Sequence, residues 1–249
     1  MTIKIGGKNY VPGMYSHKKF TGAQLADKYF SDVEKKLIEK QKALKRPEIH
    51  PCISFSRKIG VGALEVADIL GEDLGYPVMD REILTHIACE ANLSEKTVKY
   101  FDERYPGMLN EFMKYLFGEK AFIKSDYSRH LFSVVLSLGG TASTIFVGRG
   151  THLILPKNRT LAVRCTCSDE YRSKRLSRML EVSEKEAAAK LAQIDKEQQE
   201  FFKKTFGKTS VESHEFDLVL NFDLLKEPAS AAKIIKTAFM QKFQSELCG

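Results

Sequence analysis

The sequence predicts an α/β fold in which a five-stranded parallel sheet carries helices on both faces. Two observations lead to this prediction. Short apolar runs alternate with helical stretches from about residue 51 onward, and several of the helical stretches begin at a serine that can cap them. A chain of 249 residues can also bury one sizeable core, so we expect one main domain with an appendage.

Five short apolar runs are expected to form the strands. They are Cys52 to Ser56, Tyr76 to Met79, Thr144 to Gly148, Thr160 to Cys167 and Phe216 to Asn221. Helices are expected between and after them, at residues 61–74, 81–91, 94–104, 108–117, 128–138, 168–180, 183–206 and 228–243. The helical insertion at about 94–138 falls between the second and third strands. Ligands of such sheets collect at the carboxyl ends of the strands, so this insertion can cover a substrate.

The chain before the first strand is predicted to be a separate extension, residues 1–50, and the main domain is expected to span residues 51–249. Residues 22–46 have the pattern of a long amphipathic helix, with an apolar stripe at Leu25, Tyr29, Val33 and Leu37. Prolines 47 and 51 end it. Such a stripe is typical of a packing arm or of a helix that forms a homodimer.

Composition narrows the classes of function. No apolar stretch has the length of a signal core or a membrane span, so we expect a cytoplasmic protein with no membrane partner. Five scattered cysteines fit a reducing compartment, and Cys165 and Cys167 are interpreted as strand residues rather than metal ligands. The net charge of +7 predicts an anionic partner. We do not expect nucleic acid, because no basic stripe is interleaved with aromatic residues.

The segment RKIGVGALE joins the first strand to a helix, and this context favours an anion-binding loop. Amide N–H groups and the positive end of the helix converge on one spot there, and Gly60 and Gly62 let the backbone curl around a phosphate. An ordinary turn between a strand and a helix is the alternative.

These residues resemble the phosphate loop of the cytidylate kinase-like family, near the nucleoside monophosphate kinases. Ser56, Arg57, Gly60, Gly62 and Glu65 fit its loop pattern. The segments YPVMDREIL, VGRGTHLIL, SDEYRSKRL, KLAQIDKEQQEFFKKTFGK and FDLVLN match later landmarks in order, so the resemblance covers Pro51 to about Leu225. It implies a three-layer, P-loop NTPase-like fold with a lid-like region at about 172–206. It also implies the use of ATP and Mg²⁺ and a nucleotide substrate.

The loop departs from the strict phosphate-loop pattern at two positions. That pattern places lysine and then a hydroxyl residue where this chain has Ala63 and Leu64. We hypothesise that Lys58, with Arg57, supplies the missing charge from the opposite side of the loop. The alternative is that both side chains simply face solvent.

The resemblance assigns further roles on the donor side. It implies that the loop residues Ser56, Gly60, Val61, Gly62 and Ala63 hold the phosphates of ATP. It also implies that Arg172 and Arg175 reach these phosphates, although a solvated basic helix face is the alternative for both. Gln198 stands where the family has an arginine, so one more phosphate contact is expected to be missing, while Asp195 is retained. The usual hydroxyl ligand of magnesium is absent too, and Glu65 is the nearby substitute.

The acceptor side rests on Arg149 and Asp80. Arg149 follows an apolar strand, where a guanidinium can grip a phosphate with two hydrogen bonds or can brace the loop through a carboxylate. Asp80 can orient a ribose, a magnesium ion or an arginine, or can simply cap the next helix.

The predicted function is therefore an ATP-dependent phosphotransferase that acts on a nucleoside monophosphate or a similar small acceptor. The alternative is a catalytically degenerate relative that binds a nucleotide or a protein partner without turnover.

Overall fold

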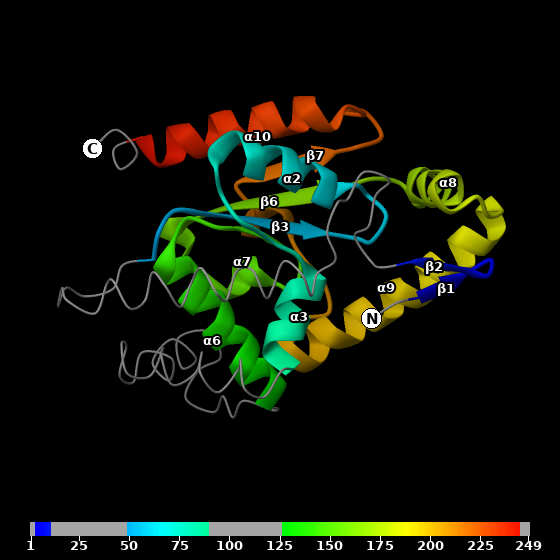
Figure 1. Cartoon of the computed structure of the whole chain (residues 1–249), viewed down its shortest axis with the longest axis horizontal. Coiled ribbons are helices and arrows are strands. Elements are labelled where there is room, and N and C mark those ends of the chain that lie inside the picture. Colours follow the sequence, from blue (N-terminus) through cyan, green and yellow to red (C-terminus); the bar gives the residue numbers. More distant parts are fainter. Residues whose placement is uncertain (1–2, 11–48, 90–125, 245–249) are drawn as a thin grey trace.

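The computed structural model describes residues 3–10, 49–89 and 126–244 (Figure 1). It contains a five-stranded sheet in which all strand pairs are parallel, in the order β4-β5-β3-β6-β7. The bounds of these strands are β3 Cys52–Arg57, β4 Val78–Met79, β5 Ile145–Val147, β6 Thr160–Thr166 and β7 Leu218–Asn221. Each lies within or next to a strand predicted from sequence, so the predicted fold class is confirmed.

The central strand β3 is fully buried along its length, because both of its faces are covered and both of its edges are paired. Phe55 pairs with Val147 of β5 on one side and with Val163 of β6 on the other. The carboxyl end of β3 therefore lies at the centre of the row formed by the carboxyl ends of the strands. A loop that follows this strand is placed where ligands of open α/β sheets bind.

Helices α2 (Ala63–Leu74) and α10 (Pro228–Lys242) cover one face of the sheet (Figure 1). Val66 and Leu70 of α2 have no exposed surface and pack in the same core cluster as Ile235 and Phe239 of α10. Burying each such side chain contributes roughly 1.5–3 kcal/mol of transfer free energy. The apolar period of α2 thus fixes its orientation on the sheet. The helix begins at Ala63, two residues later than predicted, because Val61 belongs to the preceding loop.

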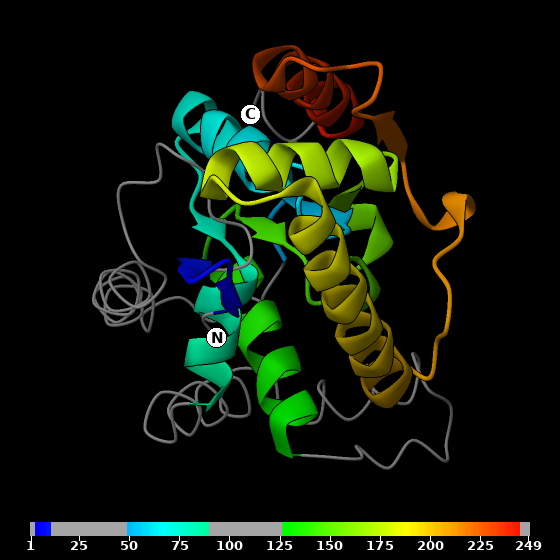
Figure 2. The same ribbon diagram turned by 90° about the vertical axis from the view of Figure 1, so that its right-hand side faces the viewer.

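The opposite face is covered by the helices α3 (Arg81–Cys89), α6 (Asp126–Thr141), α7 (Thr151–Ile154) and α9 (Glu184–Phe206) (Figures 1 and 2). These helices pack on the sheet through a second core cluster, which includes Leu84, Val135 and Phe206. Two short 3-10 helices, η1 (Lys157–Arg159) and η2 (Ser213–Glu215), lie in connecting segments. None of the described helices combines the length and apolarity that crossing a membrane requires.

Helix α8 (Asp169–Leu180) follows β6 and packs against the start of α9 through a third cluster that includes Leu176 and Leu191. Ser183 caps α9 through a complete capping box with Glu186, as the predicted serine cap required. Because α8 starts at the carboxyl end of β6, its first turns lie beside the loop after β3.

The N-terminal hairpin was not predicted, and neither were the short helix α7 and the two 3-10 helices. Strands β1 (Ile3–Ile5) and β2 (Lys8–Tyr10) form an antiparallel hairpin beside α9 (Figure 2). Gly6 in its turn leaves no room for a Cβ next to Val182, so the hairpin approaches the connection between α8 and α9 closely. The helices expected at 22–46, 94–104 and 108–117 lie outside the described residues.

Candidate functional site

The loop between β3 and α2, residues 58–62, ends in an uncapped helix N-terminus. Gly60 and Gly62 have φ values of 91° and 93°, in the left-handed region that glycine tolerates. Gly62 is the N-cap of α2 and supplies no side chain, and no side-chain cap hydrogen bond is present. The N–H groups of Ala63, Leu64 and Glu65 are therefore without a capping side chain in the described structure. Such a terminus is suited to an anion.

Arg175 of α8 lies directly beside this helix end. A Cβ placed on Gly62 would be 3.2 Å from Nε of Arg175 and 3.3 Å from its Cζ. The Nη2 of Arg175 donates to Oε2 of Glu65 at 2.7 Å, and both side chains stay partly exposed, at 24% and 31%. The absence of a Cβ at Gly62 makes room for this close approach. The loop thus carries one guanidinium at the position where its amide groups converge.

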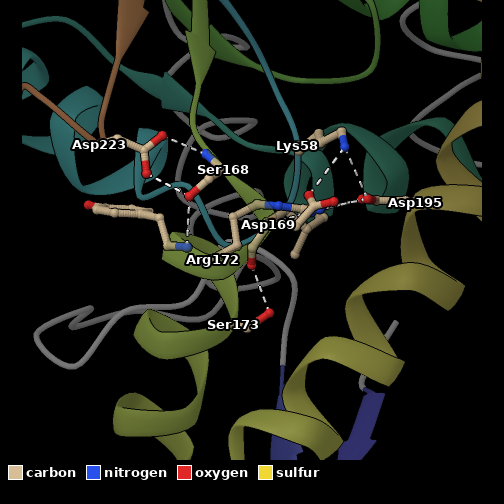
Figure 3. Close-up of polar contacts among 9 residues, drawn as sticks. Lys58, Ser168, Asp169, Arg172, Ser173, Asp195 and Asp223 are labelled. Atoms are coloured by element: carbon tan, nitrogen blue, oxygen red, sulfur yellow. Dashed lines mark hydrogen bonds and ion pairs between the residues drawn. The ribbon is translucent and has the colours of Figure 1, made fainter.

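Arg172, one turn earlier on α8, is held quite differently (Figure 3). Its side chain is 2% exposed and donates to both carboxylate oxygens of Asp195, at 2.9 and 2.7 Å, and to Asp169. Its Nη1 also donates to the carbonyl oxygen of Ile59 at 3.1 Å. We call Arg172, Asp169 and Asp195 the brace, since they tie the loop to α8 and α9.

The electrostatics of the brace favour the ionised forms of its members. Burial lowers the pKa of Arg172, but the hydrogen bonds that it donates to Asp195 and Asp169 outweigh this, so the net shift is upward. The hydrogen bond from Arg172 lowers the pKa of Asp169. Because the guanidinium of Arg172 is buried and bonded to two carboxylates, this geometry favours a bracing role over direct contact with a phosphate.

Lys58 adds a second positive charge to the brace. Its Nζ lies 3.4 Å from Asp169 and 3.5 Å from Asp195, and 46% of its side chain is exposed (Figure 3). Lys58 thus neither faces solvent alone, as one alternative held, nor contacts the uncapped helix end. The neighbouring Arg57 is buried, and its guanidinium lies 3.5 Å from the point where a Cβ on Gly148 would be.

The start of α8 is anchored to the end of the sheet. Ser168 caps this helix by accepting from the N–H of Tyr171 at 3.1 Å. Its own N–H and hydroxyl donate to the two oxygens of Asp223, which follows β7, each at 2.6 Å (Figure 3). The position of the two α8 arginines relative to the loop is therefore fixed by contacts on both sides of the helix.

Arg149 occupies the turn after β5, which is strained. Gly148, Arg149 and Gly150 all have positive φ, at 91°, 55° and 69°, and a non-glycine residue in this region is uncommon. The side chain donates to Oγ1 of Thr85 from Nε at 3.1 Å and from Nη2 at 2.7 Å, and lies 4.5 Å from the ring centre of Phe201. No carboxylate pairs with it in the described parts of the chain. Burial lowers its pKa.

Asp80 is buried and caps α3. Its Oδ1 accepts from the N–H groups of Glu82 and Ile83, each at 2.9 Å. The capping role that the sequence offered as one alternative is thus present in the structure. A role toward substrate stays a prediction.

Other predicted phosphate-binding residues have partners of their own. The hydroxyl of Ser56 accepts from Nη1 of Arg164 at 2.8 Å, and the side chain of Val61 is buried in the core on the α2 face. Gln198, at the position of a missing arginine, donates from Nε2 to the carbonyl oxygen of Arg57 at 2.9 Å. It therefore holds the end of β3, where the loop begins.

Arg164 was missed by sequence reasoning, although a signal was present. A charged residue in the otherwise apolar run LAVRCTC has to extend from a buried strand, and such a residue needs a polar or charged partner. The structure brings it to the same side of the sheet as Ser56, next to Arg57 and Lys58.

Metal binding by protein groups alone finds little support in the described residues. They contain no group of three or more histidine, cysteine, aspartate or glutamate side chains arranged to hold an ion. Burial raises the pKa of Cys165 to about 12 and that of Cys167 to about 11, so both side chains are protonated thiols at neutral pH. Glu65, the expected magnesium ligand, is bonded to Arg175. A magnesium ion here would be held mainly by phosphate oxygens and water.

Comparison with known proteins gives one family match. The model of the cytidylate kinase-like family matches residues 52–224. No curated protein matches the chain.

Several solved structures resemble the chain. An uncharacterized protein from Eubacterium ventriosum ATCC 27560 has a TM-score of 0.59 and 19% identity, and the match covers 78% of this chain and 99% of that one. A shikimate kinase from Bacteroides thetaiotaomicron has a TM-score of 0.36 and 14% identity over 78% of this chain and 96% of that one. The first likeness shows a shared fold, and the second adds nothing to it.

Proposed function

The chain belongs to the cytidylate kinase-like family, and on that premise we propose that it is an ATP-dependent phosphotransferase acting on a nucleoside monophosphate or a similar small acceptor. In this reaction the bond from the γ-phosphorus to its bridging oxygen breaks as a new bond forms to an acceptor oxygen. Such transfer depends mainly on positioning and positive charge, so the chain needs a cradle for phosphates and cations around it.

The observation that carries this proposal is the uncapped N-terminus of α2 behind two left-handed glycines, with Arg175 at 3.2 Å from the Cβ position of Gly62. Free amide groups, the positive helix end and one guanidinium converge there. A polyphosphate fits this set of groups, because all of them donate hydrogen bonds or carry positive charge.

In this proposal Arg175 supplies the positive charge that the absent lysine would provide. The brace contributes indirectly, because it holds the loop beside α8. Arg175 can turn from Glu65 toward a phosphate, since the pair is partly exposed and weakly held. Arg172 instead keeps Ile59 and the loop at a fixed distance from α8. Lys58 supplies a further charge at the mouth of the loop.

A bound magnesium ion would neutralise charge that develops on the donor phosphates. Glu65 is the carboxylate nearest to the helix end, and release from Arg175 would let it bind a water molecule of that ion or the ion itself.

Arg149 is proposed to hold the acceptor. It is a half-buried guanidinium whose partners among the described residues are a hydroxyl group and aromatic rings, so an anion would supply a counter-charge that these residues do not. Its strained backbone is consistent with a functional constraint on this turn.

The test combines binding and turnover. Calorimetric titration with ATP and a coupled assay of ATP consumption against a panel of nucleoside monophosphates should give saturable binding and turnover with at least one acceptor. Lys58→Ala should lower turnover several-fold if Lys58 contributes charge. A folded protein that binds no ATP would overturn the proposal.

A second candidate is a relative that binds nucleotide without catalysis. It is favoured by Ala63 and Leu64 at the positions of the catalytic lysine and hydroxyl, and by carboxylate partners on both Lys58 and Arg175. ATP binding in the titration, together with no consumption above the rate without protein for any acceptor, would select it.

A further inference from the structure

A cavity of about 250 Å³ lies on the α9 face of the sheet, at the carboxyl end of β3. Its walls come from the end of β3, from β6, from α9 and from the segment after α9 at residues 209–211. Three of its lining residues are the cations Arg57, Lys58 and Arg164. The uncapped end of α2 is not part of this lining, so the cavity is a separate feature.

Arg164 is a partly buried cation without a carboxylate partner among the described residues. It projects from a buried strand and is itself only partly exposed. Its hydrogen-bonding partner is the uncharged hydroxyl of Ser56, and within the described residues no carboxylate lies at ion-pair distance from it. The nearby Glu215 is bonded to Lys208 at 2.7 Å instead. Burial lowers the pKa of Arg164.

The other charges around the cavity leave it positive. Asp195 is the one carboxylate among its lining residues, and both of its oxygens accept from Arg172. Its negative charge is therefore largely neutralised within the brace. Lys58 and Arg172 together balance the charges of Asp169 and Asp195, so the surplus positive charge of the lining comes from Arg57 and Arg164.

The cavity is also lined by uncharged polar groups that can form hydrogen bonds with a ligand. Oε1 of Gln198 is buried and has no hydrogen-bond partner in the described structure, so it can accept from a hydroxyl group of a ligand. Thr209 and Ser210 are exposed residues of the lining and contribute hydroxyls. The volume lies just below the roughly 300–1,000 Å³ of sites for drug-sized ligands, so the ligand is small.

We propose that this cavity binds the phosphate group of a small, hydroxylated phosphate monoester and that Arg164 is the residue that holds the anion. A phosphate monoester carries about 1.5 to 2 negative charges at neutral pH, which matches a cluster of cations better than a carboxylate does. As a binding site the cavity stands on its own. It is distinct from the acceptor position proposed at Arg149, which does not line the cavity.

The experiment is a calorimetric titration of the full chain without ATP, at constant ionic strength, with ribose 5-phosphate and with gluconate. Ribose 5-phosphate should bind at least about tenfold more tightly than gluconate, a carboxylate with similar hydroxyl groups. Arg164→Gln should weaken the binding of ribose 5-phosphate by at least about tenfold. Arg178→Gln, which removes an exposed arginine of α8 outside the cavity, should leave it unchanged.

A second variant keeps the test decisive if Arg164→Gln fails to fold. Ser210→Glu adds a negative charge at the exposed rim and leaves β6 intact. It should also weaken the binding of ribose 5-phosphate several-fold. The proposal is overturned if wild-type protein binds no phosphate monoester, if gluconate binds equally well, or if the folded cavity variants bind like wild type. Since ATP is absent, these results are independent of whether the loop binds nucleotide.

Discussion

Arg172 and Arg175 leave the same helix three residues apart, yet they belong to two regions with different physics. The guanidinium of Arg172 is buried and bonded to two carboxylates and a carbonyl oxygen in the brace. That of Arg175 is partly exposed, has one carboxylate partner and lies over a glycine at an uncapped helix end. The first arrangement stabilises a structure, and the second leaves a cation available for a ligand. Residue type alone therefore does not indicate which basic side chain is buried in ion pairs and which stays partly exposed.

The largest expected effect comes from removing the buried arginine. Arg172→Met would leave Asp195 and Asp169 without their main partner, and losing one member of a buried pair costs about 3–5 kcal/mol. Urea denaturation should show a loss of about 3 kcal/mol in the free energy of unfolding, since Lys58 can replace part of the charge.

The matched control is Arg178→Met on the exposed side of α8, which should change the free energy of unfolding by less than about 0.5 kcal/mol. A loss below about 1 kcal/mol for Arg172→Met would mean that the brace is not a stabilising unit, and the contrast between the two regions would disappear.

Gly62→Ala should act on both stability and binding. An alanine at φ 93° is strained by about 1–3 kcal/mol, and its Cβ would press on the guanidinium of Arg175. We expect ATP affinity to fall by at least about tenfold in calorimetric titration.

Gly75→Ala separates these two effects. Gly75 ends α2 at φ 67° with no atom near the position of a Cβ, so an alanine there is strained in a similar way far from the loop. It should destabilise the protein without changing ATP affinity. Equal loss of affinity in both variants would show that general destabilisation, and not the loop, is responsible.

The smallest effect on stability is expected for Arg175→Gln. Its ion pair with Glu65 is partly exposed, and such pairs contribute about 0–1 kcal/mol. ATP affinity should nevertheless fall by about tenfold, because the charge beside the loop is lost. Arg178→Gln removes the same charge from an exposed position of α8 and serves as the control. Unchanged ATP binding in Arg175→Gln would argue against a ligand-binding role of Arg175.

Most of the fold could be predicted because its signals are local. The apolar runs that form β3, β5 and β6 and the serine caps of α8 and α9 depend on residues within a few positions of one another. The family resemblance, which the match over residues 52–224 confirms, rested on motifs in a fixed order. The N-terminal hairpin was missed because two three-residue strands carry too little periodicity.

The candidate site was predictable only in part. The glycine loop and its helix were found from their spacing, and the Arg172 and Arg175 positions were found from a motif. Their different roles were not, since Asp195 lies 23 residues from Arg172 and Glu65 lies 110 residues from Arg175. The same is true of Arg164, whose contact with Ser56 spans 108 residues.

The sequence by itself determined the order of strands and helices, the glycines that allow left-handed turns, and the surplus of positive charge. Each depends on side-chain size or short-range hydrogen bonding and can be seen without neighbours. Only the tertiary structure decided which cations are buried in pairs with carboxylates and which stay partly exposed. That outcome depends on burial and on distances between segments far apart in the chain, and both arise when the helices pack on the sheet.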